Sequence, residues 1–164
     1  MSMKKKTKKI LLIAVSAILL VGVIAMIVGL TGRTKADKGY ELVDLKFERG
    51  SLDKNGKYVE SKAFIYTKTA FDCDGEIKIK LDFESNVNYQ VYFYDAEDHF
   101  IESTEEFDGS EIVAVPENAT CARLVVSPIW DADVDEDDKT INVWQVNGLA
   151  GQLTVMVAQA SDAD

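Results

Sequence analysis

The sequence has few of the residues that carry most enzyme chemistry. Its 164 residues include one histidine, His99, and two cysteines, Cys73 and Cys121. There is no Cys-x-x-Cys motif, which together with the single histidine excludes the ligand sets of the usual zinc sites. There is no Gly-x-Ser-x-Gly motif, on which the nucleophile of an α/β-hydrolase lies. These absences favour a protein without catalysis of its own.

Acidic residues are absent from the first 35 positions. Residues 1–35 hold seven basic side chains and have a charge of +7, whereas residues 36–164 hold the other 11 basic residues and all 28 acidic ones, a net charge of −17. An acidic domain repels phosphate, so nucleic acid is not expected as a partner. The acidic excess of the second segment favours solubility.

One long apolar run occurs near the N-terminus. Ile10 to Leu30 is 21 residues without a charge, which as a helix spans the roughly 30 Å hydrocarbon core of a bilayer. Five lysines in residues 1–9 precede it, so the positive-inside rule predicts a cytoplasmic tail, a transmembrane signal anchor over 10–30 and everything later outside the cell membrane. The alternative is a cleaved signal peptide, although the apolar run is longer than a typical cleavable one.

Residues 31–38 predict a polar tether, 39–160 a single extracytoplasmic domain and 161–164 a short tail. Period-two alternation dominates the domain, as in Ile77, Ile79, Leu81 and Phe83 between charged residues. The other predicted strands are Glu41–Phe47, Lys62–Lys68, Tyr89–Asp95, Glu111–Val115, Ala122–Ser127, Thr140–Val146 and Gln152–Ala158. Short strands separated by Gly, Asn, Asp and Pro predict an all-β antiparallel sandwich.

Three segments of this domain carry a resemblance. They are Phe47-x-x-Gly50-x-Leu52-Asp53, then Val91-Tyr92-Phe93-Tyr94-Asp95, and then Pro116-Glu117-Asn118-Ala119 leading into Ala122–Pro128. Over roughly residues 40–130 the chain resembles the jelly-roll, carbohydrate-binding-module-like domains of Gram-positive bacterial surface proteins. The resemblance implies a jelly-roll-like β-sandwich and a glycan ligand. Where that family often has Asp-Gly after the aromatic strand, this chain has Glu97-Asp98-His99.

Aromatic residues are the candidates for ligand binding. If Val91 and Phe93 face the core, Tyr92 and Tyr94 lie together on the opposite face. Trp130 follows a predicted strand and precedes an acidic run, where we expect an exposed contact. Aromatic platforms bind sugar rings or anchor protein partners. The alternative for the tyrosines is packing within the sandwich.

The acidic run from Asp131 to Asp138 has six carboxylates in eight residues. Oxygen ligands at the alternating positions Asp131, Asp133 and Asp135 suit Ca²⁺, which takes 6–8 of them. The spacing is not that of an EF-hand loop. A calcium site here is one hypothesis, and a solvated loop between strands is the other.

Cys73 and Cys121 both fall in the predicted extracytoplasmic domain, where a disulfide is permitted, and free thiols are the alternative. Cys121, Arg123 and His99 are also the residue types of a sortase-like cysteine transpeptidase. Cys121 and Arg123 lie on one predicted strand, and His99 lies 22 residues before Cys121, so the expected convergence of these groups is lacking.

Taken together, the sequence predicts a membrane-anchored binding module without catalysis, which binds a surface glycan or an envelope protein. The alternative is a structural or accessory subunit of a cell-envelope membrane complex. A sortase-like transpeptidase is the remote third interpretation.

Overall fold

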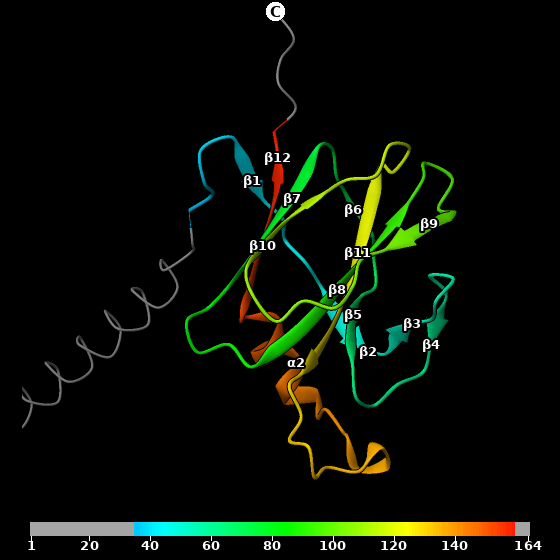
Figure 1. Ribbon diagram of the computed structural model, residues 1–164, viewed down its shortest axis with the longest axis vertical. Helices are drawn as coiled ribbons and strands as arrows, with labels where there is room; N and C mark the ends of the chain where they lie inside the picture. Colours follow the sequence, from blue (N-terminus) through cyan, green and yellow to red (C-terminus); the bar gives the residue numbers. More distant parts are fainter. Residues whose placement is uncertain (1–34, 160–164) are drawn as a thin grey trace, which may run out of the picture. The chain divides into compact units, whose positions relative to one another are not determined.

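The computed structural model describes residues 35–159, whose regular secondary structure is mostly β-strand (Figure 1). One antiparallel sheet, sheet A, has the order β1 (Tyr40–Leu42), β12 (Leu153–Ala158), β7 (Glu76–Leu81) and β10 (Glu111–Ala114). The other, sheet B, has the order β2 (Phe47–Arg49), β5 (Ile65–Thr67), β11 (Cys121–Pro128), β8 (Val87–Tyr94) and β9 (Phe100–Ser103), with β6 (Phe71–Asp72) also on β11. A hairpin of β3 (Ser51–Leu52) and β4 (Tyr58–Val59) completes the strands.

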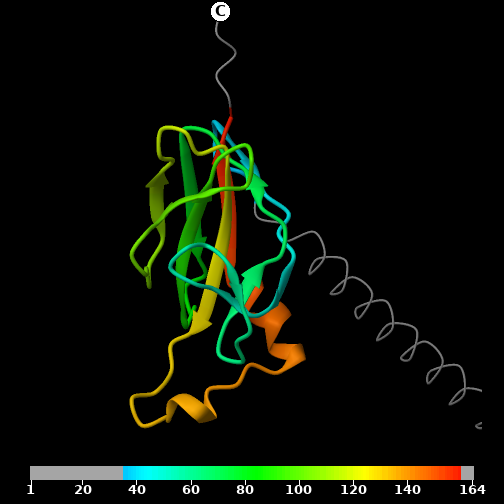
Figure 2. The same cartoon turned by 90° about the vertical axis from the view of Figure 1, so that its right-hand side faces the viewer.

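The side-chain alternation of the sequence decides which face of each sheet is buried. In β7, Ile77 and Ile79 are fully buried, while Lys78 and Lys80 lie on the other face. The inner faces of sheets A and B share one hydrophobic core, so the two sheets pack face to face (Figure 2). The predicted all-β architecture with antiparallel sheets is confirmed for the described residues.

The longest ladder joins β8 and β11 and runs from the pair Cys121 and Tyr94 to the pair Pro128 and Val87. It brings two outer-face rows side by side, because alternate residues of each strand point away from the core. β5 and β6 pair with different parts of the same edge of β11 and are separated by residues 68–70. Leu124 lies next to this gap in the ladder, and its N–H donates to the Thr67 hydroxyl at 2.9 Å.

A second, smaller core covers part of the outer face of sheet B. Its buried members are Leu52, Tyr66, Tyr92, Tyr94 and Val125. The β3–β4 hairpin closes over them through a turn at Gly56, which has φ +68°. A Cβ atom at Gly56 would lie 2.5 Å from the Phe100 ring, so only glycine fits this turn without displacement.

The predicted strand over Thr140–Val146 is wrong. An α-helix, α2 (Val143–Ala150), begins within it and buries Val146 and Leu149, three residues apart, against the core. Gln145 Oε1 accepts the N–H of Asn142 at 2.7 Å, which satisfies a donor at the helix start. The β-branched and aromatic residues of 140–146 favour a strand locally, but packing selects the helix.

The strand that contains Ile77 is also shorter than its alternation predicts. β7 ends at Leu81, and a turn follows in which the Ser85 N–H donates to the Asp82 carbonyl at 3.0 Å. Phe83 falls in this turn and is fully exposed. The strand predicted from alternation alone is therefore two residues too long at its C-terminal end.

The predicted signal anchor over residues 10–30 and the cytoplasmic tail lie outside the described residues. Within 35–159, no helix has the length and apolar character needed to cross a bilayer. The end of the predicted tether lies against sheet A: the Asp37 carboxylate pairs with Lys78 and Lys80, each at 2.7 Å.

Candidate binding site

Tyr92 and Tyr94 lie on the outer face of sheet B, as the alternation predicts, but they do not form an exposed platform. Their side chains are 5% and 2% exposed because the β3–β4 hairpin and Phe100 cover them. The Tyr94 hydroxyl donates to the Gly56 carbonyl at 2.8 Å, and burial raises its pKa to about 12. Tyr94 is therefore a packing residue in this structure.

A pocket opens farther along the same face, toward the Val87 end of β8. Its volume is about 220 Å³. Tyr92 lies at the boundary, so it belongs both to the buried aromatic cluster and to the pocket wall. The lining of the pocket includes Asn88, Gln90 and Tyr92 of β8, Val125 and Ser127 of β11, Ser51 and Phe64 beside the hairpin, and Glu106 from the β9–β10 loop.

Two amides hold the β9–β10 loop against this face. Asn88 Nδ2 donates to Glu106 Oε1 at 2.7 Å, and Gln90 Nε2 donates to the Thr104 carbonyl at 2.6 Å. A carboxylate and a carbonyl only accept, so these partners fix which end of each amide faces the loop. The Tyr92 hydroxyl in turn donates to Gln90 Oε1 at 3.0 Å.

The Ser127 hydroxyl has no such partner. Ser127 is 6% exposed, and it makes no side-chain hydrogen bond with any of residues 35–159. The buried side-chain nitrogen and oxygen atoms without a partner in residues 35–159 are Arg123 Nε and Trp130 Nε1, so the Ser127 oxygen is accessible to solvent in the pocket. A polar group that lines a pocket without a protein partner marks a place where a polar ligand or water binds.

Charge in the pocket is of one sign. Glu106 is its only charged lining side chain, and no lysine, arginine or histidine lines it. The pocket thus combines ring and aliphatic surface from Phe64, Tyr92 and Val125 with hydroxyl, amide and carboxylate groups. Apolar walls with a few polar groups are typical of small-molecule sites.

A larger and more open groove, about 570 Å³, runs over the outer face of sheet A. Lys78, Lys80, Glu111 and Ile112 are among its lining residues. Both lysines are already paired with Asp37. We place the candidate site in the smaller pocket, because its polar groups retain unused hydrogen-bonding capacity.

Trp130 does not provide the exposed contact that the sequence predicts. It is half-buried and packs against the main core. Residues 122, 124 and 126 of β11 point inward, and Trp130 continues this even-numbered series beyond the strand end. The exposed tryptophan is instead Trp144, 87% exposed in the first turn of α2 beside the 75% exposed Val143.

The acidic run lies in the loop before α2 and includes a short 3₁₀ helix, η1 (Glu136–Asp138). This loop and α2, drawn in yellow-orange and orange, lie at one end of the sandwich in both views (Figures 1 and 2). Asp131, Asp133 and Asp135 are exposed, and within 35–159 they are not among the side chains whose ligand atoms converge on a metal-sized space. The structure therefore does not bring the predicted calcium ligands together.

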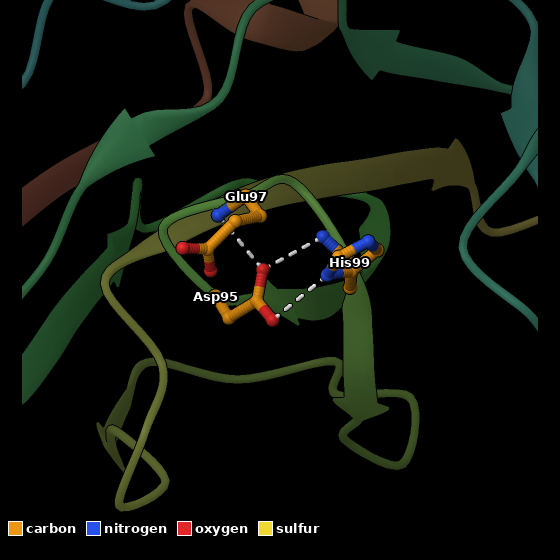
Figure 3. Close-up of side chains that lie close together, drawn as sticks. All are labelled: Asp95, Glu97 and His99. Carbon is orange, nitrogen blue, oxygen red and sulfur yellow. Dashed lines mark hydrogen bonds and ion pairs between the residues drawn. The ribbon is translucent and has the colours of Figure 1, made fainter.

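The one such convergence in the described chain is at the β8–β9 turn, where ligand atoms of Asp95, Glu97 and His99 lie within 4.8 Å of one another (Figure 3). Asp95 Oδ1 accepts the backbone N–H groups of Glu97 and His99, each at 2.9 Å, and Oδ2 lies 3.1 Å from His99 Nδ1. The bond from the His99 N–H is the main cause that lowers the pKa of Asp95. Holding the turn accounts for this arrangement.

Cys73 and Cys121 are free thiols. Cys73 belongs to the main core, whereas Cys121 packs against the outer cluster, so the two side chains lie on opposite faces of sheet B. Burial raises the pKa of Cys73 to about 12 and also raises that of Cys121. Of the two alternatives left open by the sequence, the structure has the free thiols.

The groups of a sortase-like site are each engaged elsewhere. Arg123 pairs with Asp98 at 3.1 Å and lies over the Tyr94 ring, and His99 pairs with Asp95. In the described part of the chain, no hydrogen bond joins His99 to Cys121. The Cys121 sulfur is instead 3.8 Å from the Asp95 carbonyl oxygen.

Most of the pocket was not predicted from the sequence. Asn88, Gln90 and Ser127 were not singled out, because isolated amides and serines are common on exposed strand faces. A signal was present: Asn88 and Gln90 alternate with buried residues and precede Tyr92, so they share its face. Their proximity to Ser127 and Glu106 depends on strand register and loop path, which the sequence did not provide.

Comparison with known proteins adds no relative to this description. No protein-family model, no curated protein and no solved structure matches the chain.

Proposed function

We propose that this protein is a membrane-anchored, extracytoplasmic binding module without catalysis of its own, and that its ligand is a glycan. The observation that carries the proposal is the pocket on the outer face of sheet B. There, the unpartnered Ser127 hydroxyl lies among amide and carboxylate groups beside the rings of Phe64 and Tyr92. Sugars present hydroxyl groups around an apolar ring face, so both kinds of surface have a counterpart in the pocket.

We further propose that the fold is a jelly roll. The support is the strand order. With β2, β3, β4 and β6 set aside, eight strands remain, and the sheets run β1-β12-β7-β10 and β5-β11-β8-β9. From β7 to β12 the chain then alternates between the two sheets, except that β8 and β9 are neighbours in sheet B. This is the strand order of a jelly roll, which is built from two Greek keys.

The membrane anchor remains part of the proposal and rests on the sequence. The uncharged run over 10–30 and the lysines before it favour an anchored chain with its β domain outside the cell membrane. An anchored module meets a surface glycan at high local concentration, so a modest affinity at each site is sufficient for function.

The direct test is binding of monosaccharides and short glycans to the full-length chain in detergent micelles, measured by isothermal titration calorimetry. The variant Asn88→Ala removes an amide from the pocket wall, and Asn55→Ala removes an amide from the exposed β3–β4 turn as the matched control. We expect an about tenfold loss of affinity in Asn88→Ala, since it removes hydrogen bonds to the ligand, and none in Asn55→Ala. No binding by the wild type, or equal binding by both variants, would contradict the proposal.

A second candidate function is an accessory subunit of an envelope complex. Val143 and Trp144 favour it, because they are the two most exposed large apolar side chains of α2, and exposed tryptophan is a frequent anchor of protein interfaces. If this surface binds a partner subunit, Trp144→Ala abolishes co-purification of that subunit. Phe83→Ala, which removes another fully exposed aromatic ring, leaves it intact.

A further inference from the structure

We infer that the pocket on sheet B takes a hexosamine with a free amine, and that it discriminates against N-acetylated and acidic sugars. The inference rests on the proposed glycan-binding function and deepens it. It is carried by the charge of the pocket, by the direction in which its amides point, and by its size.

Charge gives the first step. Glu106 is the only charged side chain in the lining, so a carboxylate on a sugar would meet a like charge and no cation. An ammonium group would meet an opposite charge instead. Only one Glu106 oxygen, Oε1, accepts a hydrogen bond from a described residue, Asn88, so Oε2 remains available to a ligand.

Hydrogen-bond direction gives the second step. Asn88 and Gln90 each direct an N–H at the β9–β10 loop, which leaves the Asn88 Oδ1 atom without a partner among the described residues. The acceptors that remain are Asn88 Oδ1 and Glu106 Oε2, and the donors that remain are the second N–H of Asn88 and of Gln90. The hydroxyls of Ser51 and Ser127 both accept and donate. A pocket rich in acceptors suits a ligand rich in donors, and an ammonium has three.

Size gives the third step. About 220 Å³ is less than the roughly 300–1,000 Å³ of pockets for drug-sized ligands, so the pocket holds about one sugar ring. An N-acetyl group adds bulk to the ring. Acetylation also replaces the ammonium group by a neutral amide with one N–H. The charge-assisted hydrogen bond to Glu106 is then lost, and such bonds are stronger than those between neutral groups.

The experiment measures binding of four small probes to the full-length chain in detergent micelles: glucosamine, glucose, N-acetylglucosamine and glucuronate. We expect glucosamine to bind about two- to fivefold more tightly than each of the other three, the preference that an ion pair with the exposed Glu106 carboxylate provides. A fifth probe, Nα-acetyl-lysine methylamide, presents a primary ammonium without a sugar ring, and we expect it to bind more weakly than glucosamine.

A matched pair of variants assigns the preference to the pocket. Glu106→Gln keeps the shape of the side chain and removes its charge, so we expect glucosamine and glucose to bind this variant with similar affinity. Glu105→Gln, one residue earlier and outside the pocket lining, is expected to keep the wild-type preference.

The outcomes separate this inference from the proposed function. If the sugars bind but glucosamine has no advantage, or Glu106→Gln keeps the advantage, the inference is wrong and glycan binding stands. If the lysine derivative binds as tightly as glucosamine, the pocket recognises an ammonium rather than a sugar, and the inference is again wrong. If none of the sugars binds, both fail.

Discussion

The outer face of sheet B has two halves that are built from the same strands and differ in what covers them. At the Tyr94 end of β8, the hairpin and Phe100 bury the aromatic side chains, and the Tyr94 hydroxyl donates to a backbone carbonyl. At the Val87 end, Asn88 and Gln90 hold the β9–β10 loop against the face, but a pocket stays open, where the Ser127 hydroxyl has no partner among the described residues. The covered half stabilises the fold, and the open half is where a ligand has groups to bind.

Aromatic content therefore does not by itself locate a binding face on this sheet. Tyr92 and Tyr94 of β8 are buried, since the Gly56 turn lets the hairpin approach them closely. Polar residues that alternate with core residues, such as Asn88 and Gln90, mark the open half instead. Four predictions test this division.

Tyr94→Ala should have the largest effect on stability. It removes a ring that is 2% exposed and leaves a cavity beneath the hairpin, so we expect the free energy of unfolding to fall by about 3–5 kcal/mol. Urea denaturation followed by circular dichroism measures it. Tyr94→Phe removes only the hydrogen bond to Gly56 and should cost about 1 kcal/mol. If Tyr94→Ala lowered the free energy of unfolding by less than about 1 kcal/mol, the covered half would not be tightly packed.

Thr67→Val should have the next largest effect. The Thr67 hydroxyl is buried and accepts the Leu124 N–H, so its loss leaves a buried backbone donor unpaired at a cost of about 1–3 kcal/mol. The same denaturation experiment measures the change. A variant as stable as the wild type would indicate that β5 shifts to satisfy Leu124 without this hydroxyl.

Asp95→Ala should destabilise the turn beside the covered half in a pH-dependent manner. The pKa of Asp95 is lowered from 3.8, mainly by the His99 N–H, so the folded state favours its carboxylate. Its contribution is therefore fully present above 3.8 and disappears as the pH falls through the lower folded value. We expect the melting temperature of Asp95→Ala to be below that of the wild type near neutral pH.

The difference between Asp95→Ala and the wild type should close as the pH falls below 3.8. Glu97→Gln is the control, because the Glu97 side chain makes no hydrogen bond with any described residue. It should melt with the wild type near neutral pH. A constant gap for Asp95→Ala at every pH would exclude the ionised carboxylate as the cause.

Ser127→Ala should have the smallest effect on stability and a clear effect on binding. The hydroxyl has no protein partner within 35–159, so its removal should change the free energy of unfolding by less than about 0.5 kcal/mol. Sugar affinity should fall, since a pocket hydroxyl is lost. A large destabilisation would mean that Ser127 is held by the fold rather than free for a ligand.

The sequence was sufficient for the strands whose alternation is long and regular. Ile77 and Ile79 face the core, and Val91 and Phe93 lie opposite Tyr92 and Tyr94, as period two predicts. It failed at 140–146, where strand-favouring residues open a helix whose burial of Val146 and Leu149 depends on the rest of the fold.

The candidate site was less predictable than the fold. Tyr92 was identified, but Tyr94 is covered by a hairpin that is remote in sequence, and Trp130 packs inward against the main core. The pocket requires Asn88 and Ser127 to be register partners and Glu106 to return over them. This register joins strands that lie more than 25 residues apart, so it depends on which strands pair in the sandwich as well as on the pattern within each strand.

One measurement tests the division most directly. The full-length chain, labelled with ¹⁵N in detergent micelles, is titrated with glucosamine and with glucose while the amide chemical shifts are followed. We predict shifts confined to Asn88, Gln90, Ser127 and their neighbours, with Tyr94, Val143 and Trp144 unmoved. Shifts at Val143 and Trp144 instead, or none with either sugar, would contradict the assignment of the open half of sheet B as the glycan-binding surface.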